Sequence, residues 1–325
     1  MRRRPQAHDP QARADQPMSA EERREVSRGT LRIATRGSAQ AQAQAGAVAD
    51  LLAERHRGLL VELVLVETLG DQRSDVPLHT MGGQGVFVKE VQRALLNGDA
   101  DVAVHSAKDL PSSTNAAIDG FENLQLAAFC RRRDPRDALV GASLAGLRPG
   151  ATVATGSVRR SAQLAHVRPD LKFTELRGNI HTRLEKVPRD GALVMAVAAL
   201  QILGLTDRIA EYLPVDPFVP SPGQGCVAVE CRVSDQWVAD LLAGIDDAAS
   251  RAAVEAERAF LAELGTGCSL PVGAYVDGDQ LIGFLARPEV DRVLIRRIAL
   301  PDGGERLKVA ARLAQELHDE LHEAS

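Results

Sequence analysis

The segment DVAVHSAKDLP, residues 101–111, decides the fold class. Its first half, Asp101–His105, is a short apolar strand, and charged residues follow directly where that strand ends. The same succession recurs along the chain: a strand over 31–35 precedes a helix over 39–55, and a strand over 152–154 precedes a helix that opens at Arg159. Strands that alternate with helices predict an α/β protein with mostly parallel sheets and right-handed crossovers.

The α/β pattern occurs in two sets, with a different pattern after them. The segment Arg131–Arg136 reads as a hinge between the sets, and Pro220–Gly225 reads as a tight connector before a strand over 226–231. The remainder has a long helix, a strand hairpin and a final helix, which is an α+β pattern. We expect domain 1 (α/β) at residues 29–130 and 226–244, domain 2 (α/β) at 131–225, and a small domain 3 (α+β) at 245–325.

Residues 1–28 are rich in Arg, Gln, Pro and acidic residues, and their apolar residues are scattered. Such a composition cannot bury enough surface to offset the entropy lost on ordering. We therefore expect a disordered N-terminal extension. A small excess of Arg leaves a nucleic-acid-binding arm as the alternative.

Composition restricts the class of protein. Hydrophobic residues make up 45% and charged residues 26% of the 325 residues, as in globular proteins. The net charge of −5 and the scarcity of aromatic side chains argue against a nucleic-acid or membrane partner. The longest apolar stretch, Ala192–Leu200, is shorter than a membrane helix, and no apolar signal-peptide core follows Met1. We expect a soluble, cytoplasmic protein.

The four cysteines are too few for a disulfide framework in a chain of this length. They form no C-x-x-C pair and have no histidine at zinc-ligand spacing, so no metal site is predicted. On residue type alone each is interpreted as a small buried apolar side chain. They are Cys130, Cys226, Cys231 and Cys268.

Six arginines lie at predicted strand ends or on the loops that follow them, where open α/β sheets bind ligands. Because a guanidinium pairs bidentately with a carboxylate or phosphate, the set favours a substrate with several carboxylates; ordinary solvated surface charges are the alternative. The loops Thr35–Ser38 and Thr155–Ser157 add backbone donors at helix starts. The arginines are Arg36, Arg132, Arg159, Arg160, Arg177 and Arg183.

Lys108 and Asp109 follow the buried strand that ends at His105. A carboxylate near a cationic cluster can stabilise a developing positive charge or move a proton to a leaving group. A capping or turn role for an Asp before Leu-Pro remains an equal alternative on spacing alone.

Five motifs in order closely resemble the porphobilinogen deaminase family, over roughly nine-tenths of the chain. They are HSAKDLP (105–111), GSVRR (156–160), LRGN (176–179), PGQG (222–225) and GCSLPVG (267–273). The resemblance implies two domains like periplasmic binding proteins and a third domain. It also implies the head-to-tail joining of four porphobilinogen molecules, with release of ammonia, to give the linear tetrapyrrole hydroxymethylbilane.

The resemblance further implies a dipyrromethane cofactor, attached by a thioether to Cys268 in domain 3. The other three cysteines keep the structural interpretation. By motif, Asp109 is the catalytic aspartate that contacts pyrrole N–H groups, and Lys108 joins it in the active site. Cofactor-binding positions are Ser38, Asp71, Ser157, Arg159, Arg160, Arg177 and Arg183, and substrate-binding positions are Arg36, Phe87 and Arg132.

Some residues depart from the family pattern. Thr80 and Gln84 stand on a loop that often carries lysines, and Ile202 stands where the family usually has an arginine. These departures keep open a divergent paralogue that acts on related pyrroles in a secondary pathway. A non-catalytic polycarboxylate-binding module is a second alternative, although such a module needs neither Asp109 nor Cys268. We expect a monomer.

Overall fold

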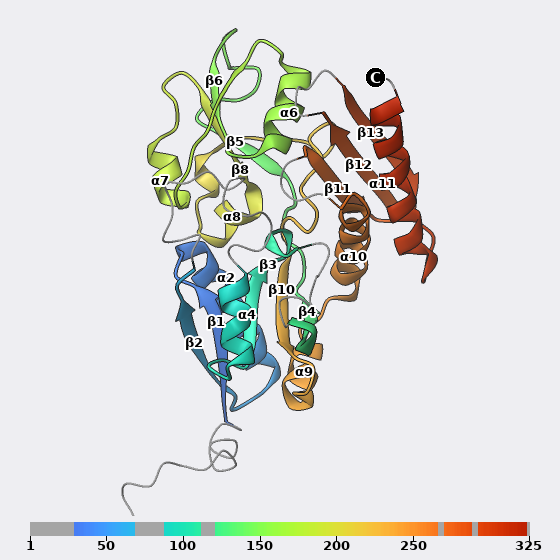
Figure 1. Ribbon diagram of the computed structural model, residues 1–325. Helices are drawn as coiled ribbons and strands as arrows, with labels where there is room; N and C mark the ends of the chain where they lie inside the picture. Colours follow the sequence, from blue (N-terminus) through green and yellow to red (C-terminus); the bar gives the residue numbers. More distant parts are fainter. Residues whose placement is uncertain (1–28, 69–87, 112–120, 266–269, 288–291, 324–325) are drawn as a thin grey trace, which may run out of the picture.

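The computed structural model describes residues 29–68, 88–111, 121–265, 270–287 and 292–323. Within these residues the chain forms three β-sheets covered by helices (Figure 1). In that view the first sheet lies at the bottom, the second at the top, and the third at the right beside the C-terminal helix. The expected α/β architecture with a small C-terminal α+β unit is confirmed.

The first sheet has the strand order β2-β1-β3-β10-β4. β1 pairs in parallel with β2 and β3, whereas β10 pairs antiparallel with β3 and with β4, so four strands share one direction. Helices α2 and α9 cover one face of this sheet and α4 covers the other. The bounds are β1 Thr30–Arg36, α2 Ala39–Arg55, β2 Leu60–Val66, α4 Lys89–Leu96, β3 Val102–Ser106, β4 Leu124–Phe129, β10 Val227–Arg232 and α9 Gln236–Ala243.

The second sheet repeats this arrangement with the order β7-β6-β8-β5-β9. β6 pairs in parallel with β7 and β8, and β5 is antiparallel to β8 and β9. Helix α6 packs on one face, and α7 and α8 pack on the other. The bounds are β5 Asp137–Val140, β6 Thr152–Ala154, α6 Val158–Val167, β7 Lys172–Thr174, α7 Ile180–Glu185, β8 Ala192–Ala196, α8 Val197–Ile202 and β9 Ile209–Tyr212.

The third sheet is an antiparallel meander that packs against two helices, α10 and α11. Its other face contacts α6 through Ile282 and Phe284, and α10 also packs against the first sheet through Val254. The third unit therefore touches both α/β units. The bounds are α10 Ala248–Glu263, β11 Val272–Asp277, β12 Gln280–Ala286, β13 Val293–Ala299 and α11 Glu305–Glu323; short 3-10 turns are η2 Ala107–Asp109, η3 Phe121–Asn123 and η4 Thr206–Arg208.

Two crossing segments connect the α/β units, residues 130–136 from β4 to β5 and residues 213–226 from β9 to β10. In each sheet the single antiparallel strand is the one that follows a crossing. A strand entered from the edge at which its parallel neighbours end must run against them. Both crossings therefore join the carboxyl edges of the two sheets, and these edges are where α/β proteins bind ligands.

Most expected elements are present. The helix over 39–55 and the strand over 152–154 have the expected bounds, and the mostly parallel character is confirmed by four strands in each sheet that share one direction. The sequence interpretation missed the strands β4, β5, β9 and β13. It also missed that β8 continues directly into the helix α8. β5 and β9 have only four residues each, and β5 is buried throughout, so neither shows alternation of apolar and polar residues.

The carboxylate of Glu257 on α10 links the third unit to both crossings. Its side chain is fully buried. It accepts two hydrogen bonds from the Arg132 guanidinium, at 2.6 and 3.0 Å, and one from the backbone N–H of Gly223 at 2.7 Å. A further bond comes from the N–H of Val276 on β11, at 2.9 Å. One carboxylate thus ties together α10, β11 and the two crossings.

We predict that Glu257→Gln lowers the free energy of unfolding by about 3–5 kcal/mol, because it leaves the buried Arg132 charge without its partner and turns an amide N–H₂ toward other donors. Chemical denaturation of the full chain measures the change. Glu255→Gln on the same helix is the matched control, since Glu255 pairs with Arg251 at the surface and its loss should cost less than about 1 kcal/mol. Equal losses in both variants would contradict the central role of Glu257.

Candidate functional site

Polar side chains of both α/β units meet where the two carboxyl edges face each other. We call this set the edge site. It consists of Arg36, Ser38, Lys108 and Asp109 from the first unit and Ser157, Arg159, Arg160, Arg177 and Arg183 from the second. Charge interactions of Asp109 with Arg183 and of Lys108 with Arg160 span the two units.

On the first unit, a small hollow is lined by Arg36, Ser38, His105 and Asp109, among other residues. Arg36 ends β1, and Ser38 caps α2 by accepting a hydrogen bond from the N–H of Ala41 at 3.3 Å. Asp109 lies in η2, which directly follows β3, and its side chain is exposed. The hollow therefore combines a carboxylate, a guanidinium and a hydroxyl that can still donate its proton.

The turn that carries Asp109 is fixed from two sides. Arg258 of α10 donates to the carbonyl oxygen of Pro111 at 2.7 Å, which anchors the chain just past the turn. On the other side Gly223, at φ +73°, packs so closely that a Cβ there would lie 3.0–3.2 Å from Ala107 and from the backbone N of Lys108. Only glycine allows the second crossing to approach η2 this closely.

Lys108 is half-buried, and its ammonium donates to the side-chain oxygen of Gln224 at 3.1 Å. Burial and the positive charge of Arg160 lower the pKa of Lys108 to about 8, although Asp109 and Asp137 act in the opposite direction. The same Gln224 donates its amide N–H groups to Asp137 Oδ1 at 2.9 Å and to the Pro135 carbonyl at 2.8 Å. Gln224 thus connects the lysine of one unit with the carboxylate of the other.

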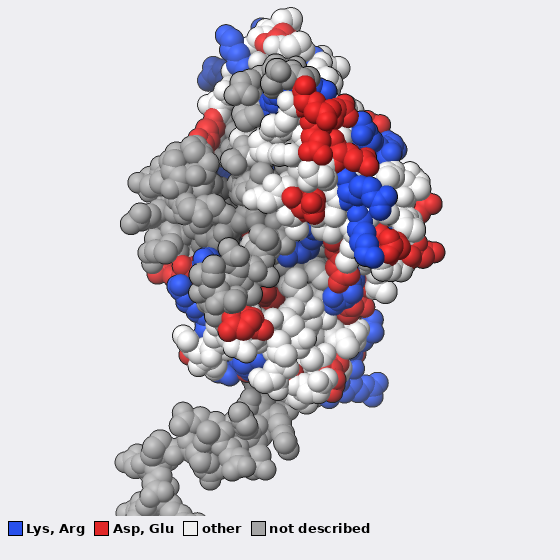
Figure 2. All heavy atoms as spheres, turned by 45° about the vertical axis from the view of Figure 1, so that its right-hand side comes forward, with Lys and Arg blue, Asp and Glu red and all other residues white. Residues whose placement is uncertain are grey.

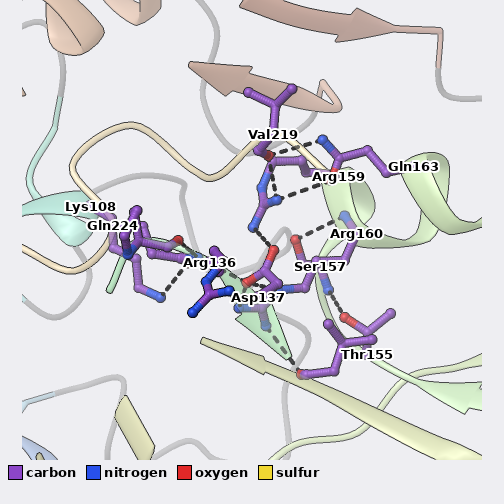
Figure 3. Close-up of polar contacts among 12 residues, drawn as sticks. Lys108, Arg136, Asp137, Thr155, Ser157, Arg159, Arg160, Gln163, Val219 and Gln224 are labelled. Atoms are coloured by element: carbon purple, nitrogen blue, oxygen red, sulfur yellow. Dashed lines mark hydrogen bonds and ion pairs between the residues drawn. The ribbon is translucent and has the colours of Figure 1, made fainter. Parts of the chain in front are cut away.

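Asp137, the first residue of β5, lies between two arginines of α6 (Figure 3). Its Oδ1 accepts from Arg160 Nε at 3.1 Å and Nη2 at 2.7 Å, and its Oδ2 lies 2.9 Å from Arg159 Nη2. Burial by itself raises the pKa of Asp137, but the two guanidinium charges outweigh it and hold that pKa well below its usual range. Asp137 is therefore ionised and neutralises part of the arginine charge.

Arg183 and Arg177 flank the start of α7. Arg183 Nε donates to the Gly178 carbonyl at 2.7 Å, and Arg177 Nε pairs with Glu175 at 3.0 Å. Burial, followed by repulsion from Arg160 and Arg177, lowers the pKa of Arg183. Like charges held together in this way bind a polyanion favourably, because the anion relieves their repulsion.

Two of the arginines predicted from the sequence make more hydrogen bonds and ion pairs with other groups of the protein than expected. Arg159 is buried and donates to the Val219 carbonyl at 2.7 Å and to Gln163 at 3.1 Å, besides its pairing with Asp137. Arg132 presents its fork to Glu257 and lies 5.0 Å over the ring of Tyr275. Their roles as cofactor and substrate ligands stay predictions.

The structure brings together nine of the predicted site residues as the edge site, whereas Arg132 lies in the first crossing and pairs with Glu257 of α10. Ser157 caps α6 much as Ser38 caps α2, accepting from the N–H of Arg160 at 3.5 Å. Asp71, Phe87 and Cys268 lie outside the described residues, as do Thr80 and Gln84.

Sequence reasoning missed Asp137 and Glu257 and did not assign a role to Gln224. Each is buried yet polar, and each reaches partners far away in the chain; Arg132 and Glu257 are 125 positions apart. The one local signal was Asp137 itself, an acid at the start of the apolar run Ala138–Val140. A charge at the first residue of a buried strand needs a partner, and this could have pointed to the arginines.

Cys130, Cys226 and Cys231 are buried free thiols, which confirms their structural interpretation. Burial raises the pKa of both Cys130 and Cys226 to about 12, so these thiols are poor nucleophiles. Among the described residues, no three His, Cys, Asp or Glu side chains gather as metal ligands would. The described helices include none that is long and apolar enough to cross a membrane.

The face of the molecule shown in Figure 2 carries basic and acidic side chains close to one another. Interspersed charges of both signs are typical of a solvated surface. The edge site differs from this, because its cations lie close enough for Arg160 to lower the pKa of both Lys108 and Arg183.

Comparison with known proteins gives consistent results for the family. The model of "porphobilinogen deaminase, dipyromethane cofactor binding domain" matches residues 31–240, and that of the "porphobilinogen deaminase, C-terminal domain" matches residues 251–323. The porphobilinogen deaminase of Roseiflexus castenholzii is 43% identical over 300 residues, which cover 90% of this chain and 97% of that protein. That of Acidothermus cellulolyticus is 49% identical over 253 residues, covering 75% and 74%.

Solved structures similar to the chain include binding proteins. The methionine binding protein MetQ has a TM-score of 0.42 at 15% identity and covers 67% of this chain and 88% of its own. The periplasmic aliphatic sulphonate binding protein SsuA of Escherichia coli has a TM-score of 0.37 at 16% identity, covering 89% and 88%. Likeness at these scores implies no shared ligand. The family models and the relatives, by contrast, span nearly the whole chain, and the chain belongs to the porphobilinogen deaminase family.

Proposed function

We propose that the protein is a hydroxymethylbilane synthase, a transferase that condenses four porphobilinogen molecules head to tail and releases ammonia at each step. The product is the linear tetrapyrrole hydroxymethylbilane, a precursor of haem. The observation that carries the proposal is the edge site, in which Asp109 of one unit faces the arginines of the other in a chain of this family.

The chemistry of the edge site fits a dipyrromethane cofactor, whose pyrroles carry carboxylate side chains. Arg183 is held near Arg160 and Arg177 at a cost in repulsion, which carboxylates would offset. The hydroxyls of Ser38 and Ser157 accept from helix N–H groups and keep their own protons to donate to the ligand. When bound through Cys268, the cofactor supplies the pyrrole end from which the chain grows.

Asp109 is suited to act on the reacting pyrrole. Loss of ammonia from porphobilinogen leaves a positively charged, azafulvene-like species, and a nearby carboxylate stabilises that charge. The same carboxylate can accept the pyrrole proton that is lost as the new bond forms. Asp109 is exposed into the hollow and its turn is fixed by Arg258 and Gly223, so it can meet a substrate without a large rearrangement.

Lys108 and Arg36 are placed to bind substrate carboxylates beside Asp109. Lys108 carries its charge below a pH of about 8, because its pKa lies there. Arg36 lines the same hollow as Asp109.

The two alternatives receive less support. A non-catalytic binding module would not require an exposed acid aimed at the ligand site, and the relatives that match most of the chain bear the name of an enzyme. The paralogue alternative rests on Ile202, which lies at the end of α8 on the second unit. The relatives do not favour it.

We also propose that the enzyme works as a monomer in the cytoplasm. Size-exclusion chromatography with light scattering would test the oligomeric state, and cell fractionation would test the localisation.

We predict that the purified protein exceeds its sequence mass by two pyrrole units, and that Cys268→Ser removes this excess. Intact-mass spectrometry of both proteins, expressed with ample porphobilinogen, measures it. Cys231→Ser is the matched control, because Cys231 is buried and accepts a hydrogen bond from Gln125 that a serine can also accept. Wild-type protein without the excess would contradict the assigned cofactor, and an excess retained in Cys268→Ser would contradict the anchor.

We predict that Asp109→Asn lowers kcat on porphobilinogen about 10²- to 10⁴-fold, the range expected when a general acid–base group is removed. Ammonia release by protein that carries the two-pyrrole mass excess gives the rate. Asp109→Glu keeps the charge and should lose less activity. Turnover of Asp109→Asn within twofold of wild type would remove Asp109 from the reaction.

A further inference from the structure

Asp137 is a fully buried carboxylate, 1% exposed, at the point where the chain enters the second unit. It has no place among the residues that the motifs assign. Its three polar partners come from two separate segments: Arg159 and Arg160 from α6, and Gln224 from the second crossing. A charge buried this deeply persists only if its partners hold it strongly.

The contacts of Asp137 fix the direction of Arg160. Asp137 Oδ1 receives both Nε and Nη2 of that guanidinium, while its Nη1 donates to the Val194 carbonyl of β8 at 3.3 Å. With three donors committed, the guanidinium cannot rotate. Arg159 is held similarly, between Asp137, Gln163 and the Val219 carbonyl.

The same carboxylate reaches Lys108 of the first unit through one intermediary. Asp137 Oδ1 accepts from Gln224 Nε2, and the Gln224 amide oxygen accepts from the Lys108 ammonium (Figure 3). Asp137 therefore orients the Gln224 amide, since only one flip of that amide satisfies both contacts. The geometry links cations of the two units to a single buried anion.

We propose that Asp137 is a positioning residue for the condensation, which holds Arg160 in place and, through Gln224, aligns the ammonium of Lys108 opposite it. This inference rests on the proposed function. Asp137 itself contacts no substrate. It acts by fixing the positions of Arg160 and Lys108, which face the substrate, and by influencing the charge of Lys108.

A consequence follows for the charge of Lys108. The charged groups that face Lys108 are Asp109 on its own turn, Asp137 on β5, and Arg159 and Arg160 on α6. The two carboxylates favour the protonated amine, and the two guanidiniums disfavour it. Removing the charge of Asp137 leaves the arginines unopposed on that side, so the ammonium loses its proton at a lower pH.

The test is Asp137→Asn, which keeps the shape of the side chain and removes its charge. Competitive labelling of amines with acetic anhydride across pH, read by peptide mass spectrometry, gives the titration of Lys108. The titration is measured in full-length protein carrying Cys268→Ser, so that no attached pyrrole contributes charge. We expect Lys108 to titrate about one pH unit lower in Asp137→Asn than with Asp137 intact. In Asp137→Asn protein that retains Cys268, the alkaline limb of the pH profile of kcat/KM should move in the same direction.

Asp134→Asn is the matched control. Asp134 lies in the crossing that leads to Asp137 and pairs with Arg136 at 2.6 Å, yet it is not among the groups that face Lys108. It should leave the Lys108 titration and the alkaline limb unmoved. A merely structural role for Asp137 would lower the melting temperature and leave both readouts as in wild type, and that result would overturn the proposal.

A further variant covers the case in which Asp137→Asn does not fold. Asp137→Glu keeps the charge and displaces the carboxylate by one methylene, so KM for porphobilinogen should rise several-fold while the Lys108 titration stays near that of wild type. Wild-type KM in Asp137→Glu would overturn the proposal. The labelling needs no turnover, so an inactive wild-type protein would refute the proposed function and leave the Lys108 comparison to decide the role of Asp137.

Discussion

The arrangement of the three units depends on the buried carboxylate of Glu257. Taking a carboxylate and a guanidinium out of water costs several kcal/mol per ion, and this cost is offset only if the remaining hydrogen-bonding capacity is filled. Glu257 meets this condition with two bonds from Arg132 and two from backbone N–H groups. Because the two backbone donors belong to the second crossing and to β11, α10 can satisfy its buried charge in one position only.

That constraint reaches the edge site through neighbouring residues. Arg258 follows Glu257 on α10 and donates to the Pro111 carbonyl. The helix whose position Glu257 fixes therefore also fixes the turn of Asp109. Arg132, held by Glu257, donates its Nε to the backbone carbonyl of Gln224 at 2.8 Å, and Gln224 in turn contacts Lys108. α10 ends at Glu263, shortly before Cys268, the residue proposed to carry the cofactor. The turn of Asp109 and the contact between Gln224 and Lys108 therefore both depend on the position of α10.

The sequence allowed the fold class and most element positions to be predicted, because these follow from local patterns, and the same patterns favour a site at the carboxyl edge of the sheets. The strand over 152–154 and the helix that was predicted to open at Arg159 follow from the alternation of strands with helices, and the expected ligand edge follows from the strand-to-helix order. What the sequence did not reveal is which arginines are neutralised internally. Arg132 pairs with Glu257 and Arg159 with Asp137, across 125 and 22 positions, and no periodicity encodes such pairs. The short buried strand β5 was missed for a related reason, since it lacks the alternation by which a half-buried strand is recognised.

The internal acids have a consequence for catalysis as well as for folding. A site that met its polycarboxylate with every arginine unpaired would bind the product as tightly as the transition state, and binding energy of this uniform kind does not raise kcat. Glu257 commits Arg132 to the protein, and Asp137 commits Arg159 and offsets part of the charge of Arg160, whose direction it fixes. Each step of the proposed reaction adds a pyrrole with two more carboxylates, so product affinity would otherwise rise as the chain grows. Under the proposed function, buried anions that offset part of the positive charge would let the site orient its substrates and still release a long polyanion.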